Sequence, residues 1–492
     1  MTVGAAEQRL RSNDVTQMQT NLAWETLFDV SAQPAGPLRE RLTRAIRAAI
    51  RDGRLPRGVA LPPSRMLAAD LGISRWAVTQ AYGQLVTEGY LASRTGSATR
   101  VVWSPEPDED RIAHRGTPSA ATPSPPPRFD LSMCSPDYRA FPRRKWVEAI
   151  RTAAENTPFD QLDYGDTGGE PRLRAILAEH LSRSRGAAAE AATVTIFSGA
   201  RQAMAQVCRA LFEAGHRQIG MENPGSSGLW EAARTAGLDL VALPVDDDGL
   251  VVDALGEHPG LRAVCVGAAH QLMLGCPLAP YRRQALLDWA RRVDGLVIED
   301  DYDAEFSYDG PAPPVMQGTD RRRVALLGSM SRALTPSINV GWVVAPPYWL
   351  PAVRAGFTPT PPALTQLALA NFMESGAYDR HLRASRMRFR RRRDALVAAL
   401  ERELPGRPVR GIQAGLHVLI RLPDDTDIPA VQAAAERRGM ELCDPAELRF
   451  QPVPSEPWLP LGYANLSDAV VDEAVAVLAD LLRASRQIGA QG

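Results

Sequence analysis

The chain offers few residues that could bond covalently to a substrate or hold a metal ion. Lysine and arginine together number 56, and Lys145 is the only lysine, so the other 55 basic residues are arginine. An arginine guanidinium stays protonated and supplies no nucleophilic amine, so any lysine chemistry has one candidate. The five cysteines are scattered and form no CxxC pair or other metal-ligand spacing. We therefore expect no metal site, and no Ser/His/Asp constellation stands out.

Charge and composition favour a polyanion-binding segment within a cytoplasmic protein. Residues 37–103 hold eleven arginines against four acids, a local net charge of +7; the whole chain is at −1, so the remainder sums to −8. A confined basic block is typical of a nucleic-acid-binding module. No apolar run approaches the roughly 20 residues that a membrane span needs. The polar N-terminus shows no signal-peptide pattern, so we expect no membrane partner.

The elements predicted for residues 37–103 are those of a winged helix-turn-helix. Apolar residues recurring every four positions predict a first helix with one buried stripe: Leu38, Leu42, Ile46 and Ile50. Ser64 and Ser74 are expected to cap a short second helix (65–71) and a third helix (75–88). Residues 90–102 are typical of a hairpin, the wing.

In such a module the helix after the turn enters the major groove by its N-terminal residues. The residues expected to contact DNA are Arg65, Ser74, Arg75, Trp76, Thr79, Arg94 and Gly96. We expect Arg65 to contact backbone phosphate, and Arg75 and Trp76 to contact base edges or flanking phosphate. Gly96 is expected at the tip of the wing. A solvated basic bundle is the alternative interpretation.

The rest of the chain divides into segments of different composition and hydrophobic pattern. Residues 1–36 form a polar N-terminal segment, and residues 104–128 are a Pro-rich linker that cannot bury a core. In residues 129–400, short β-branched runs alternate with amphipathic helices, which predicts a large α/β domain with a doubly wound, mostly parallel sheet. Residues 401–492 are expected to form a smaller α+β domain. The strands expected in the large sheet are 193–197, 218–221, 261–266, 296–298, 324–327 and 340–344.

Two groups of motifs resemble known families. GRLPRGVALPPSRMLAADLGISRWAVTQAYGQLVTEGYLASRTGSATRV (residues 53–101) resembles the GntR-type DNA-binding domain, with Trp76 where that family carries a small polar residue. The later series LDYGDTGGEPRLR, FSGARQAM, ENPG, HQLMLGCPL, VIEDDYDAEF and LGSMSRALTPSINVGW resembles the MocR-like regulators. In these a GntR-type head is fused to a type I aminotransferase fold. The resemblance covers nearly the whole chain and implies a homodimer.

The resemblance also implies where pyridoxal phosphate would bind. The cofactor needs a lysine amine for its Schiff base, a carboxylate at its ring nitrogen and backbone N–H groups at its phosphate. Asp300 matches the ring-nitrogen partner, and Tyr302 matches the tyrosine at the ring oxygen. The phosphate cradle survives in part, in Ser198, Gly199 and Ala200, with Ser329 and Ser331 opposite.

Five positions depart from the family pattern. The Schiff-base lysine falls on Arg332, the phosphate-binding arginine on Asn339 and the stacking tyrosine on Ser226. The substrate-carboxylate arginine falls on Gly228, and the proline expected inside HQLMLG is Met273. Lys145 lies in FPRRKW, far from the matched motif, and is expected to be a surface residue. We therefore expect a degenerate site with no covalent pyridoxal phosphate, no catalytic residue and no transamination.

Three interpretations of the pocket remain open. Arg332 fills an empty ring site and pairs with Asp300, or it receives another anionic effector, or pyridoxal phosphate binds without a covalent bond. His270 and His417 either line the cavity or are structural. The arginine run 388–393 is either a solvated helix face or a surface that touches DNA.

These observations predict a DNA-binding transcription regulator. Its aminotransferase-like domain would serve as a dimerisation and effector-sensing module that lacks the Schiff-base lysine. One alternative is an enzyme that uses this fold for chemistry independent of pyridoxal phosphate. Another is a regulator whose sensor domain is inactive and which acts constitutively or through a protein partner.

Overall fold

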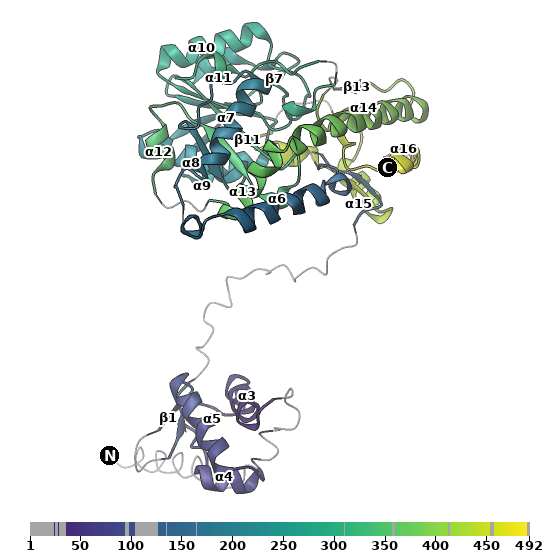
Figure 1. Cartoon of the computed structure of the whole chain (residues 1–492). Helices are drawn as coiled ribbons and strands as arrows, with labels where there is room; N and C mark the ends of the chain where they lie inside the picture. The colour runs from purple at the N-terminus through teal and green to yellow at the C-terminus, as the bar shows by residue number, and fades with distance from the viewer. Residues whose placement is uncertain are drawn as a thin grey trace, which may run out of the picture. The chain divides into compact units, whose positions relative to one another are not determined.

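The computed structural model divides into two compact units, residues 1–124 and 125–492 (Figure 1). The structure describes residues 24, 28, 36–93, 98–103, 126–133, 135–163, 165–308, 310–356, 360–411, 414–452 and 457–489. The predicted linker lies almost wholly outside these residues. Within the described ranges, none of the helices combines the length and the apolar character needed to cross a bilayer.

The first unit has the predicted helix, helix, helix, hairpin order. Its elements are α3 (Leu38–Arg51), α4 (Ser64–Asp70), α5 (Arg75–Thr87), β1 (Leu91–Ala92) and β2 (Arg100–Val101), the two strands pairing antiparallel. Three residues of the predicted stripe, Leu42, Ile46 and Ile50, are fully buried, whereas Leu38 is 38% exposed at the start of α3. The helix predicted over 65–71 instead begins at Ser64, because Pro63 takes the capping position.

The second unit is built on a seven-stranded sheet. Its strand order is β4 (Val194–Phe197), β12 (Gly341–Val344), β11 (Val324–Ser329), β10 (Leu296–Asp300), β9 (Ala263–Val266), β5 (Gln218–Glu222) and β6 (Asp239–Leu243). All six predicted strands are confirmed, and β6 at the edge is a seventh. The sheet is parallel except for β12, which pairs antiparallel with both β11 and β4. The parallel strands therefore end at one common edge.

Helices cover both faces of this sheet because alternate side chains of each strand point to opposite faces. Cys265, Ile298 and Leu327 belong to the core under α8 (Ala200–Glu213) and α9 (Ser227–Thr235), whereas Val264 and Val297 belong to the core under α10 (Pro280–Val293). The helices of the large domain are α6 (Arg143–Asn156), α7 (Pro171–Arg185), α8 (Ala200–Glu213), α9 (Ser227–Thr235), α10 (Pro280–Val293), α11 (Met316–Thr319), α12 (Leu350–Arg354) and α13 (Ala363–Glu374). A small hairpin joins β7 (Val245–Asp246) to β8 (Gly249–Leu250).

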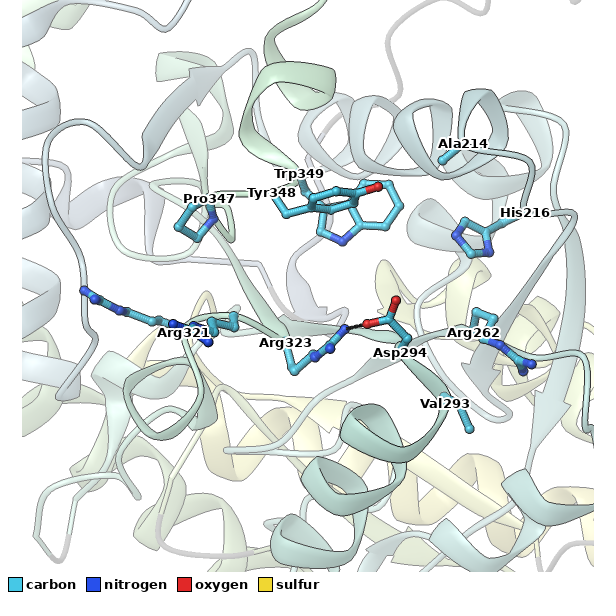
Figure 2. Close-up of a pocket in the computed structure, with 11 residues that line it drawn as sticks. Ala214, His216, Arg262, Val293, Asp294, Arg321, Arg323, Pro347, Tyr348 and Trp349 are labelled. Atoms are coloured by element: carbon cyan, nitrogen blue, oxygen red, sulfur yellow. Dashed lines mark ion pairs between the residues drawn. The ribbon is translucent and has the colours of Figure 1, made fainter.

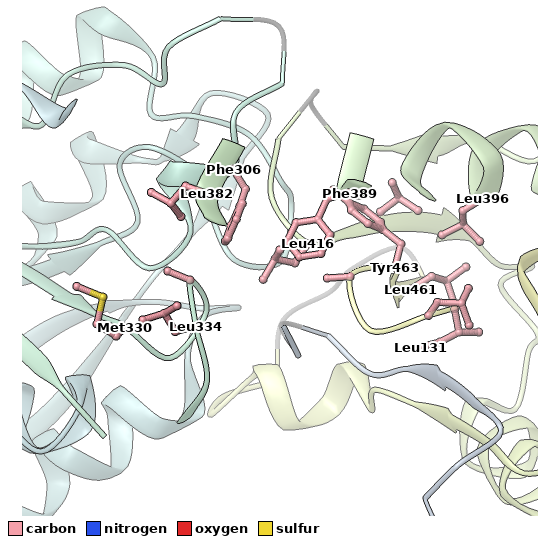
Figure 3. Close-up of a cluster of buried hydrophobic side chains, with 14 of the residues drawn as sticks. Leu131, Phe306, Met330, Leu334, Leu382, Phe389, Leu396, Leu416, Leu461 and Tyr463 are labelled. Carbon is pink, nitrogen blue, oxygen red and sulfur yellow. The ribbon is translucent and has the colours of Figure 1, made fainter. Parts of the chain in front are cut away.

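The C-terminal part forms a smaller α+β domain. Its elements are β13 (Val409–Arg410), β14 (His417–Arg421), α15 (Ile428–Arg437), β15 (Met440–Leu442), β16 (Trp458–Gly462) and α16 (Val471–Gly489). Long helix α14 (Ala377–Glu403) leads into it across the boundary expected at residue 400. Strand β3 (Phe129–Leu131), expected in the large domain, pairs in parallel with β15. One cluster of buried apolar side chains joins Met330 of the large domain to Leu416 and Tyr463 of the small one (Figure 3).

Candidate DNA-binding surface and aminotransferase-like pocket

The N-terminus of α5 presents an exposed set of polar and aromatic side chains. Ser74 caps the helix, and its hydroxyl accepts a hydrogen bond from the backbone N–H of Ala77 at 3.2 Å. Arg75, Trp76 and Thr79 are exposed on this first part of the helix, and the Trp76 residue is 62% exposed. A large exposed indole next to an exposed guanidinium is available for contact with a partner.

Contacts within the head fix the angle at which α5 leaves the turn. The buried Tyr82 hydroxyl donates to the Pro62 carbonyl at 2.9 Å, which ties α5 to the segment before α4. The Arg47 guanidinium holds Glu88 with two nitrogens, at 2.7 and 3.0 Å, and lowers the pKa of the Glu88 carboxyl. Arg65 is exposed at the start of α4.

Five of the seven residues predicted to contact DNA can therefore be placed: Arg65, Ser74, Arg75, Trp76 and Thr79 are exposed at the beginnings of α4 and α5. The other two, Arg94 and Gly96, lie outside the described residues. The hairpin on which they were predicted is present, with Leu91 opposite Val101.

The residues predicted for the pocket follow the carboxyl ends of the parallel strands. Ser198 follows β4, Ser226 follows β5, His270 follows β9, Tyr302 follows β10 and Arg332 follows β11. Asp300 is the last residue of β10. In open α/β sheets this edge is where ligands bind, since the loops there converge.

Only a small space remains beside Asp300. The cavity there has a volume of about 20 Å³, enough for about one water molecule. Three predicted residues, Ser226, Asp300 and Tyr302, line it together with Glu222 and Trp230. The structure thus brings these predicted residues together in a nearly filled site.

Two buried carboxyl groups dominate the electrostatics of this cavity. Burial raises the pKa of Asp300 to about 7; the charges of Asp301 and Asp303 add to this rise, and that of Arg332 opposes it. Burial also raises the pKa of Glu222 to about 8, although the Gly267 N–H donates to its carboxylate at 3.2 Å. The two carboxyl groups therefore carry protons near neutral pH much more readily than ordinary acids.

His270 and His417 pack against each other next to Tyr302, and neither lines this cavity. Both are buried, with ring centroids 5.6 Å apart. His270 Nδ1 lies 2.8 Å from Asp303 Oδ2 and 2.9 Å from the Tyr302 hydroxyl. Burial lowers the pKa of His417 to about 3, so this ring is neutral. These contacts give His270 a part in holding Tyr302 in place.

The segment matched to the phosphate cradle is bonded to protein groups. The backbone N–H of Ser198 donates to Gln202 Oε1 at 2.5 Å, and the Ser331 N–H donates to the Ser329 hydroxyl at 3.4 Å. Gly199 has a φ of +86° directly before Ala200, the first residue of α8. A Cβ built on Gly199 would lie 3.1 Å from Asn339 Oδ1.

Asn339 also faces a different space. It lines a cavity of about 700 Å³ beside α6 and α13, together with Trp146, Ile150 and Leu364. The structure therefore does not group Asn339 with Ser226 and Asp300 in one cavity. Lys145, on α6, is 46% exposed and bonds to Glu148 at 2.7 Å.

The arginine run 388–393 was predicted as either a solvated helix face or a DNA contact. Arg390 and Arg391 are exposed, whereas Arg388 is only partly exposed and Arg392 is buried. Arg392 is buried and pairs with Asp468 and, at 3.0 Å, with Asp137. Arg388 also reaches Asp137 at 3.0 Å. Arg388 and Arg392 therefore tie α14 to two segments distant in sequence. The partners are separated by more than 70 positions in sequence, so the run alone could not reveal them.

The sequence analysis missed two pairs of charged residues. The first is Glu222 with Asp300: Glu222 is the last residue of β5, as Asp300 is of β10. This matching position at two strand ends could have identified Glu222 as a residue of the cavity. Arg185 and Asp301 form a two-point ion pair, at 2.8 and 2.9 Å, in which both side chains are buried. Nothing local in the sequence indicated this pair.

Comparison with known proteins agrees with both units. Residues 38–101 match the gntR family of bacterial regulatory proteins, and residues 130–478 match the aminotransferase class I and II family. The probable rhizopine catabolism regulatory protein MocR of Rhizobium meliloti is 32% identical, over 92% of this chain and 95% of the relative. The chain belongs to the MocR-like regulators.

Other relatives cover the same two units. The HTH-type pyridoxine biosynthesis transcriptional regulator PdxR of Corynebacterium glutamicum is 33% identical to this MocR-like chain, over 82% of the chain and 86% of the relative. Among solved structures, an archaeal alanine:glyoxylate aminotransferase superposes with a TM-score of 0.66 at 23% identity, over 72% of this chain and 91% of the enzyme. This last likeness concerns the fold alone.

Proposed function

We propose that this chain is a DNA-binding transcription regulator that acts in the cytoplasm. The observation that carries the proposal is the exposed N-terminus of α5 on a GntR-type head, where Arg75, Trp76 and Thr79 stand free of the head's own core. The two relatives that match over 92% and 82% of the chain are named as a regulatory protein and an HTH-type transcriptional regulator, which supports the same function.

A gel shift with the DNA upstream of the gene and its neighbours tests this function. Arg75→Ala removes a guanidinium expected at base edges, so binding should weaken by about 1–3 kcal/mol, and Arg65→Ala should lower the salt slope by about one. Arg54→Ala, an exposed arginine elsewhere on the head, is the matched control and should bind as the native protein does. Equal binding by all three variants would contradict the proposal.

We further propose that the aminotransferase-like domain forms no Schiff base and catalyses no transamination. Arg332 stands where the family carries its lysine, and its charge acts on Asp300, the residue matched to the ring-nitrogen partner. The space there is about 20 Å³, whereas ligand pockets measure roughly 300–1,000 Å³. The residues present therefore do not fit pyridoxal phosphate. Of the three interpretations of the pocket, this volume favours a filled ring site.

The same domain is proposed to hold two copies of the chain together and to sense an effector. Apolar side chains stay exposed on α6 and at the start of α13: Val147 at 52%, Ile150 at 43% and Leu364 at 41%. A contiguous exposed apolar surface of this kind marks an interaction site. Two copies would present two heads to two DNA half-sites. An effector would have to bind two arrangements of the protein with different affinity.

A further inference from the structure

Another cavity lies at the edge of the sheet opposite to Asp300. The segments that lead into β5, β9, β10 and β11 line it, together with the segment after antiparallel β12. Its volume is about 720 Å³, within the roughly 300–1,000 Å³ of small-molecule sites. The length of the strands therefore separates this cavity from the aminotransferase-like pocket.

Positive charge exceeds negative charge in this cavity. Four arginines line it, Arg262, Arg321, Arg322 and Arg323, against the single carboxylate of Asp294, so the formal charge of the lining is +3. Asp294 pairs with Arg323, and Arg321 pairs at 3.4 Å with Glu190, which is not part of the lining. The Arg262 guanidinium donates to two backbone carbonyls, at 2.7 and 2.8 Å. Within the described part of the chain, neither Arg262 nor Arg322 has a carboxylate partner. The cavity is thus built to attract an anion.

Two aromatic rings form the wall that faces these arginines. Figure 2 shows Tyr348 and Trp349 on one side of the cavity, with Arg321 and Arg323 on the other. Tyr348 is 82% exposed, and its ring meets the Trp349 ring edge-on at 5.5 Å. The Trp349 ring also lies 5.9 Å from the ring of His216. The Tyr348 ring therefore has a face available for stacking.

We propose that this cavity binds a nucleoside phosphate. Guanidinium forks match phosphate oxygens, and a planar base stacks on tyrosine or tryptophan. An inorganic anion would leave the two rings without a role, and an uncharged aromatic molecule would leave the excess positive charge without a counterion. A base that carries phosphates would stack on the aromatic rings and also pair its phosphates with the arginines. This binding is independent of DNA recognition by the head, so either can fail without the other.

The test is the binding of a fluorescently labelled ADP to the full-length protein, followed by anisotropy. Arg322→Glu and Tyr348→Ala should each weaken binding about tenfold or more, which corresponds to about 1.4 kcal/mol. Both residues are exposed, so neither change disturbs a packed core. Arg383→Glu, an exposed arginine on α14, makes the same charge change outside the cavity and should leave binding unchanged.

Competition identifies the ligand chemistry. ADP should displace the probe at concentrations about tenfold or more below those of inorganic phosphate or adenosine. Equal displacement by phosphate alone, equal loss in Arg383→Glu, or no saturable binding would each overturn the proposal. Displacement by a short single-stranded oligonucleotide at a lower nucleotide concentration than ADP would assign the cavity to a nucleic-acid strand instead.

Discussion

Lys145 Nζ lies 2.7 Å from Glu148 Oε2, one turn further along α6, at the surface of the protein. This hydrogen bond lowers the pKa of the Glu148 carboxyl. The chain's only lysine therefore lies at the surface of α6 and does not line the Asp300 cavity.

Pyridoxal phosphate should leave no covalent adduct on the native protein. The measurement is borohydride reduction after incubation with the cofactor, followed by mass analysis of the intact chain. Arg332→Lys supplies an amine at the position matched to the family's lysine, so an adduct confined to that variant would identify the arginine as the cause. A pyridoxyl adduct on the native chain would refute the proposal that the Schiff base is lost.

The stability of the second unit should depend on the ionisation of Glu222. Its folded pKa is raised from 4.5 to about 8, so its contribution to stability is complete below its unfolded pKa and is lost as pH rises through the folded pKa. Relative to the native protein, Glu222→Gln should gain stability between about pH 5 and pH 8, because an amide cannot ionise. Urea unfolding across this range measures the difference.

Glu179→Gln serves as the control for that experiment. Glu179 is exposed and pairs with Arg183 on the surface of α7. The difference in unfolding free energy between Glu179→Gln and the native protein should stay constant over the same pH range. A parallel pH response of both variants would show that burial of Glu222 is not the cause.

Arg185→Leu should destabilise the second unit by about 3–5 kcal/mol, because it leaves the Asp301 carboxylate buried without its partner. Both side chains of this pair are below 10% exposed. Arg183→Leu, two residues earlier on α7, breaks only exposed ion pairs and should cost at most about 1 kcal/mol. Denaturant unfolding compares the two. Similar losses in both variants would contradict the special role of the buried pair.

Replacing Val147 and Ile150 together by glutamate should convert a dimer into monomers, because two charges would then have to be buried in the proposed interface. Light scattering coupled to size-exclusion chromatography measures the mass. Met387→Glu, on an exposed residue of α14, adds a charge elsewhere and should leave the dimer intact. A native protein that elutes as a monomer would remove the dimer from the proposal.

The strands of the large sheet could be predicted because their β-branched runs stand out between helices. Strand β6 was missed because this edge strand begins at an exposed aspartate and is only partly buried. The direction of β12 was also beyond reach, since the sequence of a buried strand looks the same in either orientation. The predicted cap at Ser74 was confirmed, because its side-chain hydrogen bond to the start of α5 is a local signal.

Predictions for the pocket were less complete for a physical reason. The motifs located Asp300 and Tyr302, but the volume between them depends on side chains such as Trp230, which comes from another helix. The role of Arg392 depends on Asp137 and Asp468, which approach it only in the folded chain. Contacts between distant segments determine which side chains are buried, and burial in turn shifts the pKa values of buried acids such as Asp300.

The position of β3 has a mechanical consequence. Phe129 N–H donates to the Gly439 carbonyl at 3.0 Å, and Arg128 pairs with Glu473 of α16 at 2.7 Å. The start of the second unit is thus anchored to the smaller domain. Any movement of that domain relative to the large sheet would carry residue 128 with it.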